Sequence, residues 1–300
     1  MLKKHMELRI ALIAGVLGLT SMACALLQGG TSSPPGQGVE KPAATQPGAA
    51  APAPAQNTAT PSPTAGQKPN AYYEGIAFYY DPSLAKGVGA QTIEASAPAG
   101  DNQPFFAVNP KEYQFDFQGY PVADSMKPEI LIFSADEYEK LMTGGDPNPV
   151  TRELDGLKKL LADRPADSSG RLPFLPVWDA GQLLHFHLKY VKFQNGEGIR
   201  YLTEYGQDMA PLSNKLLFYT FQGLTSDGAY YISAVLPTTH APLAGDNGET
   251  LSKQDHGKFI ENYAAYAVDV QNLLNAEKDG SFSPTLEKLD ALIASIKIGK

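Results

Sequence analysis

The chain has only one cysteine, Cys24, in 300 residues, and that cysteine lies close to the N-terminus. The rest of the chain therefore contains no disulfide bond, no cysteine-based metal site and no thiol nucleophile. Without a covalent cross-link, a folded region must be stabilised by packing. Residues 71–300 are numerous enough to bury a sizeable core, as one large domain or as two small ones.

Recognisable catalytic motifs are missing as well. The sequence contains no Gly-x-Ser-x-Gly elbow, no phosphate-binding glycine loop and no His-Glu-x-x-His pair. We therefore expect no cofactor, and the sequence favours a non-catalytic function. A hydrolase or a metal-dependent enzyme without a recognisable motif remains the alternative.

The chain also has no excess of basic side chains. It contains 24 Lys and Arg against 32 Asp and Glu, which gives a net charge of −8. Residues 1–70 hold five of the basic and two of the acidic side chains, a net +3, so the rest of the chain carries −11. Such a surface repels nucleic acid and anionic lipid at long range. We expect no nucleic-acid partner.

Residues 1–24 have the order of a secretory signal, in which a basic start precedes an apolar core and then small residues. The apolar core spans 10–19, and the basic residues before it are Lys3, Lys4 and Arg9. The stretch resembles a bacterial lipoprotein signal that ends at Cys24. Ala23 fits that pattern, whereas Met22 is larger than usual and Ser21 replaces an aliphatic residue.

The resemblance implies that Cys24 receives a diacylglyceryl group, that the signal is cleaved before it, and that the new N-terminus is acylated with a fatty acid such as palmitate. The lipoprotein would then be held at the outer, extracytoplasmic face of the cell membrane. Two alternatives remain. One is an uncleaved anchor, because residues 10–27 approach the ~18–20 apolar residues that span a bilayer, and the other is a soluble secreted protein.

Residues 25–70 are mostly Ala, Pro, Gly, Gln, Thr and Ser, with almost no large apolar side chain after Leu27. Such a segment cannot offset its ordering entropy by burial, so we predict a disordered linker that acts as a tether. A flexible coil of about 46 residues spans roughly 40 Å, and prolines lengthen it. In a second interpretation the tether carries sugars, on Thr58, Thr60, Ser62 and Thr64.

The region 71–300 begins with strand patterns. Aromatic and β-branched residues at 72–80 end at the turn signal Asp81-Pro82 and predict the first strand. Further strands are predicted at 89–95, 113–118 and 129–134, with buried-face residues Tyr113, Phe115 and Phe117. Ser134 and Glu137 form a capping box that opens a helix at 135–142, and a second helix spans 151–164.

Residues 165–171 are polar and predict either a loop or a seam between two subdomains. Four strands are predicted after them, at 182–193, 198–205, 215–223 and 229–236. Asn-Gly and Asp-Gly between these runs are strong hairpin signals, so we expect an antiparallel meander. Helical periodicity then predicts one helix from 252 to a C-cap at Gly280, a second at 285–295, and a short strand at 296–298.

Interspersed strands and helices with many hairpins predict an α+β fold, an antiparallel sheet covered by helices. Tyr79-Tyr-Asp-Pro-Ser-Leu84 and Leu289-Asp-Ala-Leu-Ile-Ala-Ser-Ile-Lys-Ile298 are similar to the PsbP-like domains, which implies an α/β/α sandwich. Gly198-Ile-Arg-Tyr-Leu-Thr-Glu-Tyr-Gly206 and the run from Phe218 to Pro237 resemble uncharacterised, lipid-anchored bacterial domains. That second resemblance implies export and a shared fold, and carries no known activity.

His185 and His187 lie two residues apart on a predicted strand, so we expect both on one face, a spacing that some metal sites use. A metal would need a third ligand, for which His240 and Asp179 are candidates. The alternative is an ordinary polar face of a sheet. We therefore treat the two histidines as weak metal candidates.

Tyrosine is the other notable side chain, because five tyrosines fall on consecutive predicted strands. Its apolar ring and polar tip suit recognition surfaces. The candidate binding residues are Trp178, Arg200, Tyr201, Tyr205, Tyr219 and Tyr230. In the alternative interpretation, these rings fill the core or cover a face of the sheet.

Together these patterns predict a lipid-anchored extracytoplasmic domain that is a binding module rather than an enzyme. Its expected partners are the membrane, through the lipid anchor, and an unknown protein, peptide or cell-envelope component. An extracytoplasmic enzyme without a recognisable motif is one alternative. An accessory subunit of a membrane complex, which the PsbP-like resemblance favours, is another.

Overall fold

The computed structural model describes residues 67–98, 104–122, 126–142, 148–166, 170–246 and 255–299. The predicted signal, Cys24 and the tether up to residue 66 lie outside the described residues, as do positions 167–169 of the predicted seam. Among the described residues, no helix is long and apolar enough to cross a membrane.

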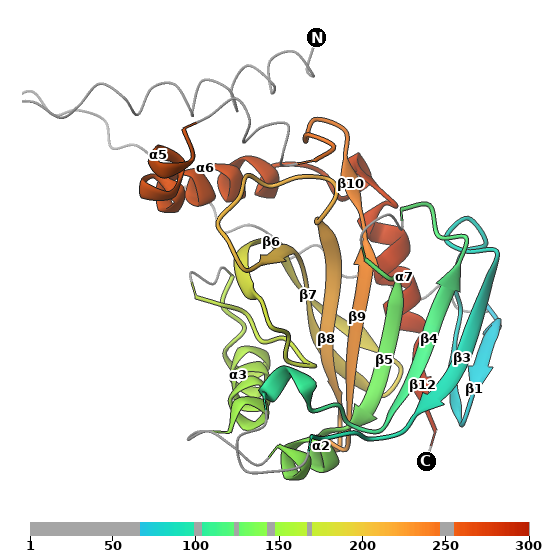
Figure 1. Ribbon diagram of the computed structural model, residues 1–300. Helices are drawn as coiled ribbons and strands as arrows, with labels where there is room; N and C mark the ends of the chain where they lie inside the picture. Colours follow the sequence, from blue (N-terminus) through green and yellow to red (C-terminus); the bar gives the residue numbers. More distant parts are fainter. Residues whose placement is uncertain are drawn as a thin grey trace, which may run out of the picture.

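A seven-stranded antiparallel sheet forms the centre of the fold (Figure 1). Its strands, in spatial order, are β3 (Gly87–Ile93), β4 (Glu112–Gln118), β5 (Glu129–Ser134), β9 (Tyr230–Pro237), β8 (Phe218–Thr225), β7 (Gly196–Gly206) and β6 (Gly181–Phe193). Strands β6 to β9 pair consecutively, which confirms the predicted meander. The α+β class with an antiparallel sheet is therefore correct.

Helices cover both faces of the sheet. On one face, α6 (Tyr263–Asn275) and α7 (Leu286–Ser295) share a buried apolar cluster with strand residues such as Phe186 and Phe221. On the other face, α2 (Ala135–Leu141) and α3 (Pro149–Asp163) share a cluster with residues such as Ile199 and Tyr231. Figure 1 shows α7 behind the sheet and α3 in front of it. The short 3-10 helix η1 (Phe105–Ala107) precedes β4.

Local capping explains where α2 and α3 begin. The predicted capping residue Ser134 accepts a hydrogen bond from the Glu137 N–H at 3.3 Å. Helix α3 begins two residues before the predicted position, because Asn148 accepts bonds from the N–H groups of Val150 and Thr151. It ends at Arg164, in the left-handed region directly before Pro165.

A three-stranded sheet joins the two ends of the described chain. It consists of β1 (Ala71–Tyr73), β2 (Ile76–Phe78) and β12 (Lys297–Ile298). The predicted single strand at 72–80 is wrong, because Glu74 and Gly75 both have positive φ and turn the chain into a hairpin. Glutamate is a weak hairpin signal, so the sequence did not reveal this turn.

The predicted single helix from 252 to Gly280 is also wrong, and its positions 252–254 lie outside the described residues. It is divided into α5 (His256–Glu261) and α6 at Asn262, whose side chain donates to the Lys258 carbonyl at 2.8 Å and competes with the helical ladder. Gly280 lies in the 3-10 helix η2 (Asp279–Ser281). After it, β11 (Phe282–Ser283) pairs with β10 (Thr239–His240) and leads into α7.

Candidate functional site

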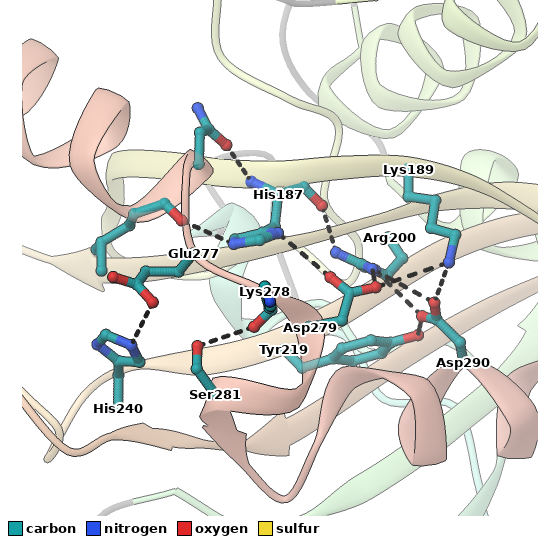
Figure 2. Close-up of polar contacts among 12 residues, drawn as sticks. His187, Lys189, Arg200, Tyr219, His240, Glu277, Lys278, Asp279, Ser281 and Asp290 are labelled. Atoms are coloured by element: carbon teal, nitrogen blue, oxygen red, sulfur yellow. Dashed lines mark hydrogen bonds and ion pairs between the residues drawn. The ribbon is translucent and has the colours of Figure 1, made fainter. Parts of the chain in front are cut away.

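Arg200 lies in the middle of β7 with 1% of its surface exposed, and each nitrogen of its guanidinium group donates a hydrogen bond (Figure 2). Nε is 3.1 Å from Asp290 Oδ1, and Nη2 is 2.9 Å from Asp279 Oδ2. Nη1 donates to the His187 carbonyl oxygen at 2.7 Å. A buried charge is tolerated only when it is paired in this way. Burial acts to lower the Arg200 pKa, but the charges of Asp290 and Asp279, together with the hydrogen bond to Asp290, outweigh burial and raise it.

Asp290, on α7, is the fully buried acceptor of this ion network, with 0% exposed surface. Besides Arg200, it accepts hydrogen bonds from Lys189 Nζ at 2.8 Å and from the Tyr219 hydroxyl at 3.1 Å. Burial, and then the Asp290 charge, raise the Tyr219 pKa well above its usual value, so that hydroxyl stays a donor. The carboxylate thus joins β6, β7 and β8 to α7.

Asp279, in η2, is the second carboxylate of the network and lies nearer to solvent. Burial opposes its ionisation, but the His187 hydrogen bond and the charges of Arg200 and Lys189 lower its pKa below the usual value. The carboxylate is therefore ionised at neutral pH. It attaches the link between α6 and α7 to the sheet.

His187 enters the network through a β-bulge. Two residues of β6, His187 and Leu188, lie opposite Tyr201 alone, and His187 has a φ of 56°. Its Nδ1 is 3.4 Å from Asp279 Oδ1, and its Nε2 is 2.8 Å from the Leu274 carbonyl oxygen. The bulge aims this side chain at the C-terminal helices, and the strain of its backbone is offset by these contacts.

Because of the bulge, the predicted alternation of side chains between the two faces of β6 is wrong. His185 packs edge-on against Tyr201 in the cluster under α3, whereas His187 packs against Phe282 on the face of α6 and α7. The two histidines therefore lie on opposite faces, because one extra residue exchanges the faces of all that follow. The described residues contain no group of three potential metal ligands among His, Cys, Asp and Glu. The residues present do not fit a metal at this pair.

The two suggested third ligands have other contacts. His240 is buried with its ring 4.8 Å from that of Phe282, and its Nε2 is 3.6 Å from Glu277 Oε2. Burial lowers the His240 pKa, and the charge of Glu277 partly opposes that effect. Asp179, two residues before β6, accepts a hydrogen bond from Gln207 at its carbonyl oxygen. The Phe282 ring packs against both His240 and His187.

The ion pairs of the Arg200 network connect strands of the sheet to C-terminal elements. Its two cations, Arg200 and Lys189, are matched by two carboxylates, and each charge already has a partner. The network connects β6, β7 and β8 to η2 and α7, so it fixes the C-terminal part of the chain on the sheet. We therefore regard it as a structural clamp rather than as the place where a ligand binds.

A second cluster, of aromatic rings, lies at one end of β7 and β8. Its members are Phe174, Trp178, Tyr205 and Phe218, which we call the aromatic cluster. The Phe174 ring lies 4.7 Å from Trp178 and 4.8 Å from Tyr205, and Trp178 lies 5.7 Å from Phe218. Trp178 and Tyr205 are half-buried, whereas Phe174 and Phe218 are buried beneath them.

The cluster depends on residues 171–178, here called the strap, which cross the sheet without regular secondary structure. Side chains from other parts of the fold form hydrogen bonds with the backbone groups of the strap. The N–H groups of Leu172, Phe174 and Leu175 donate to Gln182, Glu153 and Gln222, and the Pro173 carbonyl accepts from the Tyr201 hydroxyl at 2.9 Å. Buried backbone groups must be paired, so these contacts hold Phe174 and Trp178 in place.

The six predicted binding residues therefore separate into several places. Trp178 and Tyr205 come together in the aromatic cluster, and Arg200 and Tyr219 come together in the buried clamp. Tyr201 is fully buried, so Arg200, Tyr201 and Tyr219 lie in the core, as the alternative interpretation expects, and do not belong to an outward surface. Tyr230, at the start of β9, is half-buried against the core. The strands β7, β8 and β9 are covered on both faces, which the sequence did not indicate.

Several residues of these clusters were missed from the sequence, namely Lys189, Asp279, Asp290, Phe174, Phe218 and Gln222. One of them carried a usable signal. Asp290 interrupts an apolar helix stripe, so it would be a buried charge in need of a partner. Comparisons of the chain with family models, with curated proteins and with solved structures find no match.

Proposed function

We propose that this chain is a lipid-anchored, extracytoplasmic, non-catalytic domain that binds a protein, a peptide or a cell-envelope component. The observation that carries the proposal is the aromatic cluster, in which Trp178 and Tyr205 are half-exposed over Phe174 and Phe218. Tryptophan and tyrosine supply large contact areas at low entropic cost and are enriched where proteins bind their partners.

The surroundings of the cluster support binding. Gln182 donates to the Tyr205 hydroxyl at 3.2 Å, and Gln207 donates to the Asp179 carbonyl at 3.1 Å, so amide groups border the rings. The strap is fixed by hydrogen bonds from its neighbours, so little freedom remains to be lost on binding. Rigid rings with adjacent polar groups favour a partner that has both apolar and hydrogen-bonding surface.

The proposed anchor rests on the sequence, since the segment 10–24 lies outside the described residues. Its basic start, apolar core and terminal Cys24 support export and lipidation at the outer face of the membrane. With two or more acyl chains, such a protein is stably held. The Pro/Ala/Gly-rich segment that follows supports a spacer between the lipid and the domain.

Trp178 allows a direct test, because it is the only tryptophan in the chain. The full chain should capture a partner from its own membranes, and addition of that partner should change the Trp178 emission. Trp178→Ala should weaken capture about 30-fold or more, the loss typical of an aromatic hot spot. The matched control is Phe106→Ala, which removes another exposed aromatic ring and should leave capture unchanged. If the Trp178→Ala variant captured the partner as well as wild type does, the aromatic cluster would be excluded as the binding surface.

An extracytoplasmic hydrolase is the second candidate, and Glu112 is the observation that favours it. Burial, and then the nearby charge of Glu129, raise the Glu112 pKa to about 7. A carboxyl group that titrates near neutral pH suits general acid–base catalysis. If the protein hydrolyses an envelope substrate, Glu112→Gln should abolish turnover, whereas Trp178→Ala should mainly raise KM.

We also propose a PsbP-like α/β/α sandwich, in which the domain serves a membrane complex as an accessory subunit. The two segments that resemble PsbP-like domains meet, since Ser295 Oγ lies 2.9 Å from the Tyr79 nitrogen and 3.0 Å from its carbonyl oxygen. Helices on both faces of the sheet also support the sandwich. Native gels of solubilised membranes test the subunit role, because a subunit migrates with a large complex.

A further inference from the structure

The two edges of the seven-stranded sheet are built differently. β6, at one edge, has two register shifts in its pairing, includes lysines, and packs against α6 and α7. Its His187 N–H donates to Asn275 Oδ1 at 2.7 Å, so a helix side chain already pairs with one backbone N–H group of this strand. Bulges, lysines and helical cover are the devices by which proteins keep a sheet edge from pairing with another chain.

Within the described part of the chain, β3, at the other edge, has no such protection. Its sequence, Gly-Val-Gly-Ala-Gln-Thr-Ile, contains neither a charge nor a proline, and its register with β4 is unbroken over all seven residues. Ala90 and Gln91, at its centre, are exposed. Within the described ranges, β4 is the only strand that pairs with β3. An uncharged edge strand of this length, with an unbroken register, is suited to accept another strand.

β1 lies beside β3 in Figure 1 but belongs to the separate three-stranded sheet. The Tyr73 ring of β1 packs against Tyr113 and Phe115 of β4, with ring centroids 6.3 Å apart in both pairs. The Tyr73 hydroxyl also lies 3.0 Å from Thr92 Oγ1. These contacts place β1 against a face of the large sheet, and no backbone ladder joins it to β3.

The sequence around Ala90 is complementary to itself. If two β3 strands pair antiparallel about Ala90, the residue four places before it lies opposite the residue four places after it. Lys86 then faces Glu94 of the partner subunit, and the twofold axis repeats the contact. Lys86 takes part in none of the ion pairs of the described chain, and Glu94 has only an exposed pair with Lys111 at 3.3 Å.

We propose that β3 pairs antiparallel with β3 of a second copy of this chain, centred on Ala90, so that two seven-stranded sheets become one. The match of Lys86 to Glu94 of the partner subunit arises when two identical strands pair about Ala90. It therefore favours a second copy over an unrelated peptide. The interface is at the β3 edge, whereas β8 and β7, which carry Phe218 and Tyr205, lie next to the β6 edge. It therefore does not depend on the proposed binding role of the aromatic cluster.

Cysteine cross-linking tests the register. Opposed Cα atoms in an antiparallel pair are ~4.5–5.5 Å apart, within the ~4.4–6.8 Å that a disulfide bond requires. In the full chain carrying Cys24→Ser, Ala90→Cys should give a disulfide-linked dimer on oxidation with copper phenanthroline. The matched control is Ala264→Cys, at an exposed position of α6, which should stay monomeric. Equal dimer yields from the two variants would overturn the proposal.

Charge exchange tests the contacts at the two ends of the pair. Lys86→Glu places like charges opposite each other and should lower the yield of the Ala90→Cys dimer about 10-fold. Adding Glu94→Lys to the same chain should restore the yield. A second charge change would not repair a folding defect caused by Lys86→Glu, so restoration would show that the two side chains face each other. Sedimentation of the unsubstituted chain in detergent should give a dimer mass. A monomer at all concentrations, or a double exchange that fails to restore the dimer, would refute the pairing.

Discussion

Among single residues, Glu204 of β7 has an unusual environment. Its side chain is buried under α6 with 1% of the residue exposed, and Oε2 accepts a hydrogen bond from the Ser213 N–H at 3.3 Å. Within the described part of the chain, Oε1 has no hydrogen-bond partner, and neither has the buried Ser213 hydroxyl. Burial raises the Glu204 pKa to about 7, and the Ser213 hydrogen bond only partly opposes this effect. The folded state therefore favours the protonated acid.

Glu204→Gln should remove a pH dependence of stability. Because the folded-state pKa is raised, from 4.5 to about 7, the contribution of Glu204 is fully present below about pH 4.5 and is lost as the pH rises through 7. Relative to wild type, the glutamine variant should gain up to about 3 kcal/mol of unfolding free energy between pH 5 and pH 8. Urea titrations followed by Trp178 emission at both pH values measure this difference.

Glu261→Gln is the control for that experiment, because Glu261 is exposed at the end of α5. It should show no such change between pH 5 and pH 8. If the Glu204→Gln and wild-type curves stayed parallel over this range, the Glu204 carboxyl group would not be held protonated by the fold.

At the scale of whole elements, the ion network determines how the C-terminal helices are attached. Arg200 reaches Asp279 of η2 and Asp290 of α7, so a single side chain of β7 holds two consecutive elements. Arg200→Met keeps most of the side-chain volume but leaves Asp290 buried with Lys189 as its only cation. Breaking a buried ion pair on one side typically costs about 3–5 kcal/mol. We expect a loss of that order, with faster hydrogen exchange in α7.

Lys140→Met is the matched control for the clamp. It removes a lysine from an ion pair whose two side chains, Lys140 and Asp136, are 76% and 79% exposed. Such a surface pair contributes little, so stability should change by less than about 0.5 kcal/mol. Unchanged exchange rates in α7 of the Arg200→Met variant would mean that apolar packing alone attaches this helix.

The local elements were largely predictable because their signals are local. Asn195-Gly196 and Asp227-Gly228 mark the hairpins, and Ser134 and Glu137 mark the start of α2. The β6 bulge was not predictable, since His187 takes a positive φ only because contacts far along the chain, at Leu274 and Asn275, hold it there. The same holds for Arg200, whose partners Asp279 and Asp290 follow it by 79 and 90 residues.

At the scale of the whole molecule, the two ends of the described chain are held together. β12, at the C-terminal end, pairs with β2 near the start of the described chain, and Asn195 donates to the Ile298 carbonyl at 2.8 Å. Both ends of the domain are thereby fastened to its core. The stability of the domain should therefore be independent of what happens at Cys24.

Cys24→Ser tests this independence together with the proposed anchor. If Cys24 carries the lipid, the variant should lose its acyl chains and leave the detergent phase, or stay attached through an uncleaved signal. In both cases the urea midpoint of the domain should equal that of wild type, because the described core contains no cysteine. Fatty-acid labelling, phase partitioning and Trp178 emission measure lipidation, attachment and stability. A shifted urea midpoint would show that the chain is not divided into anchor, tether and domain.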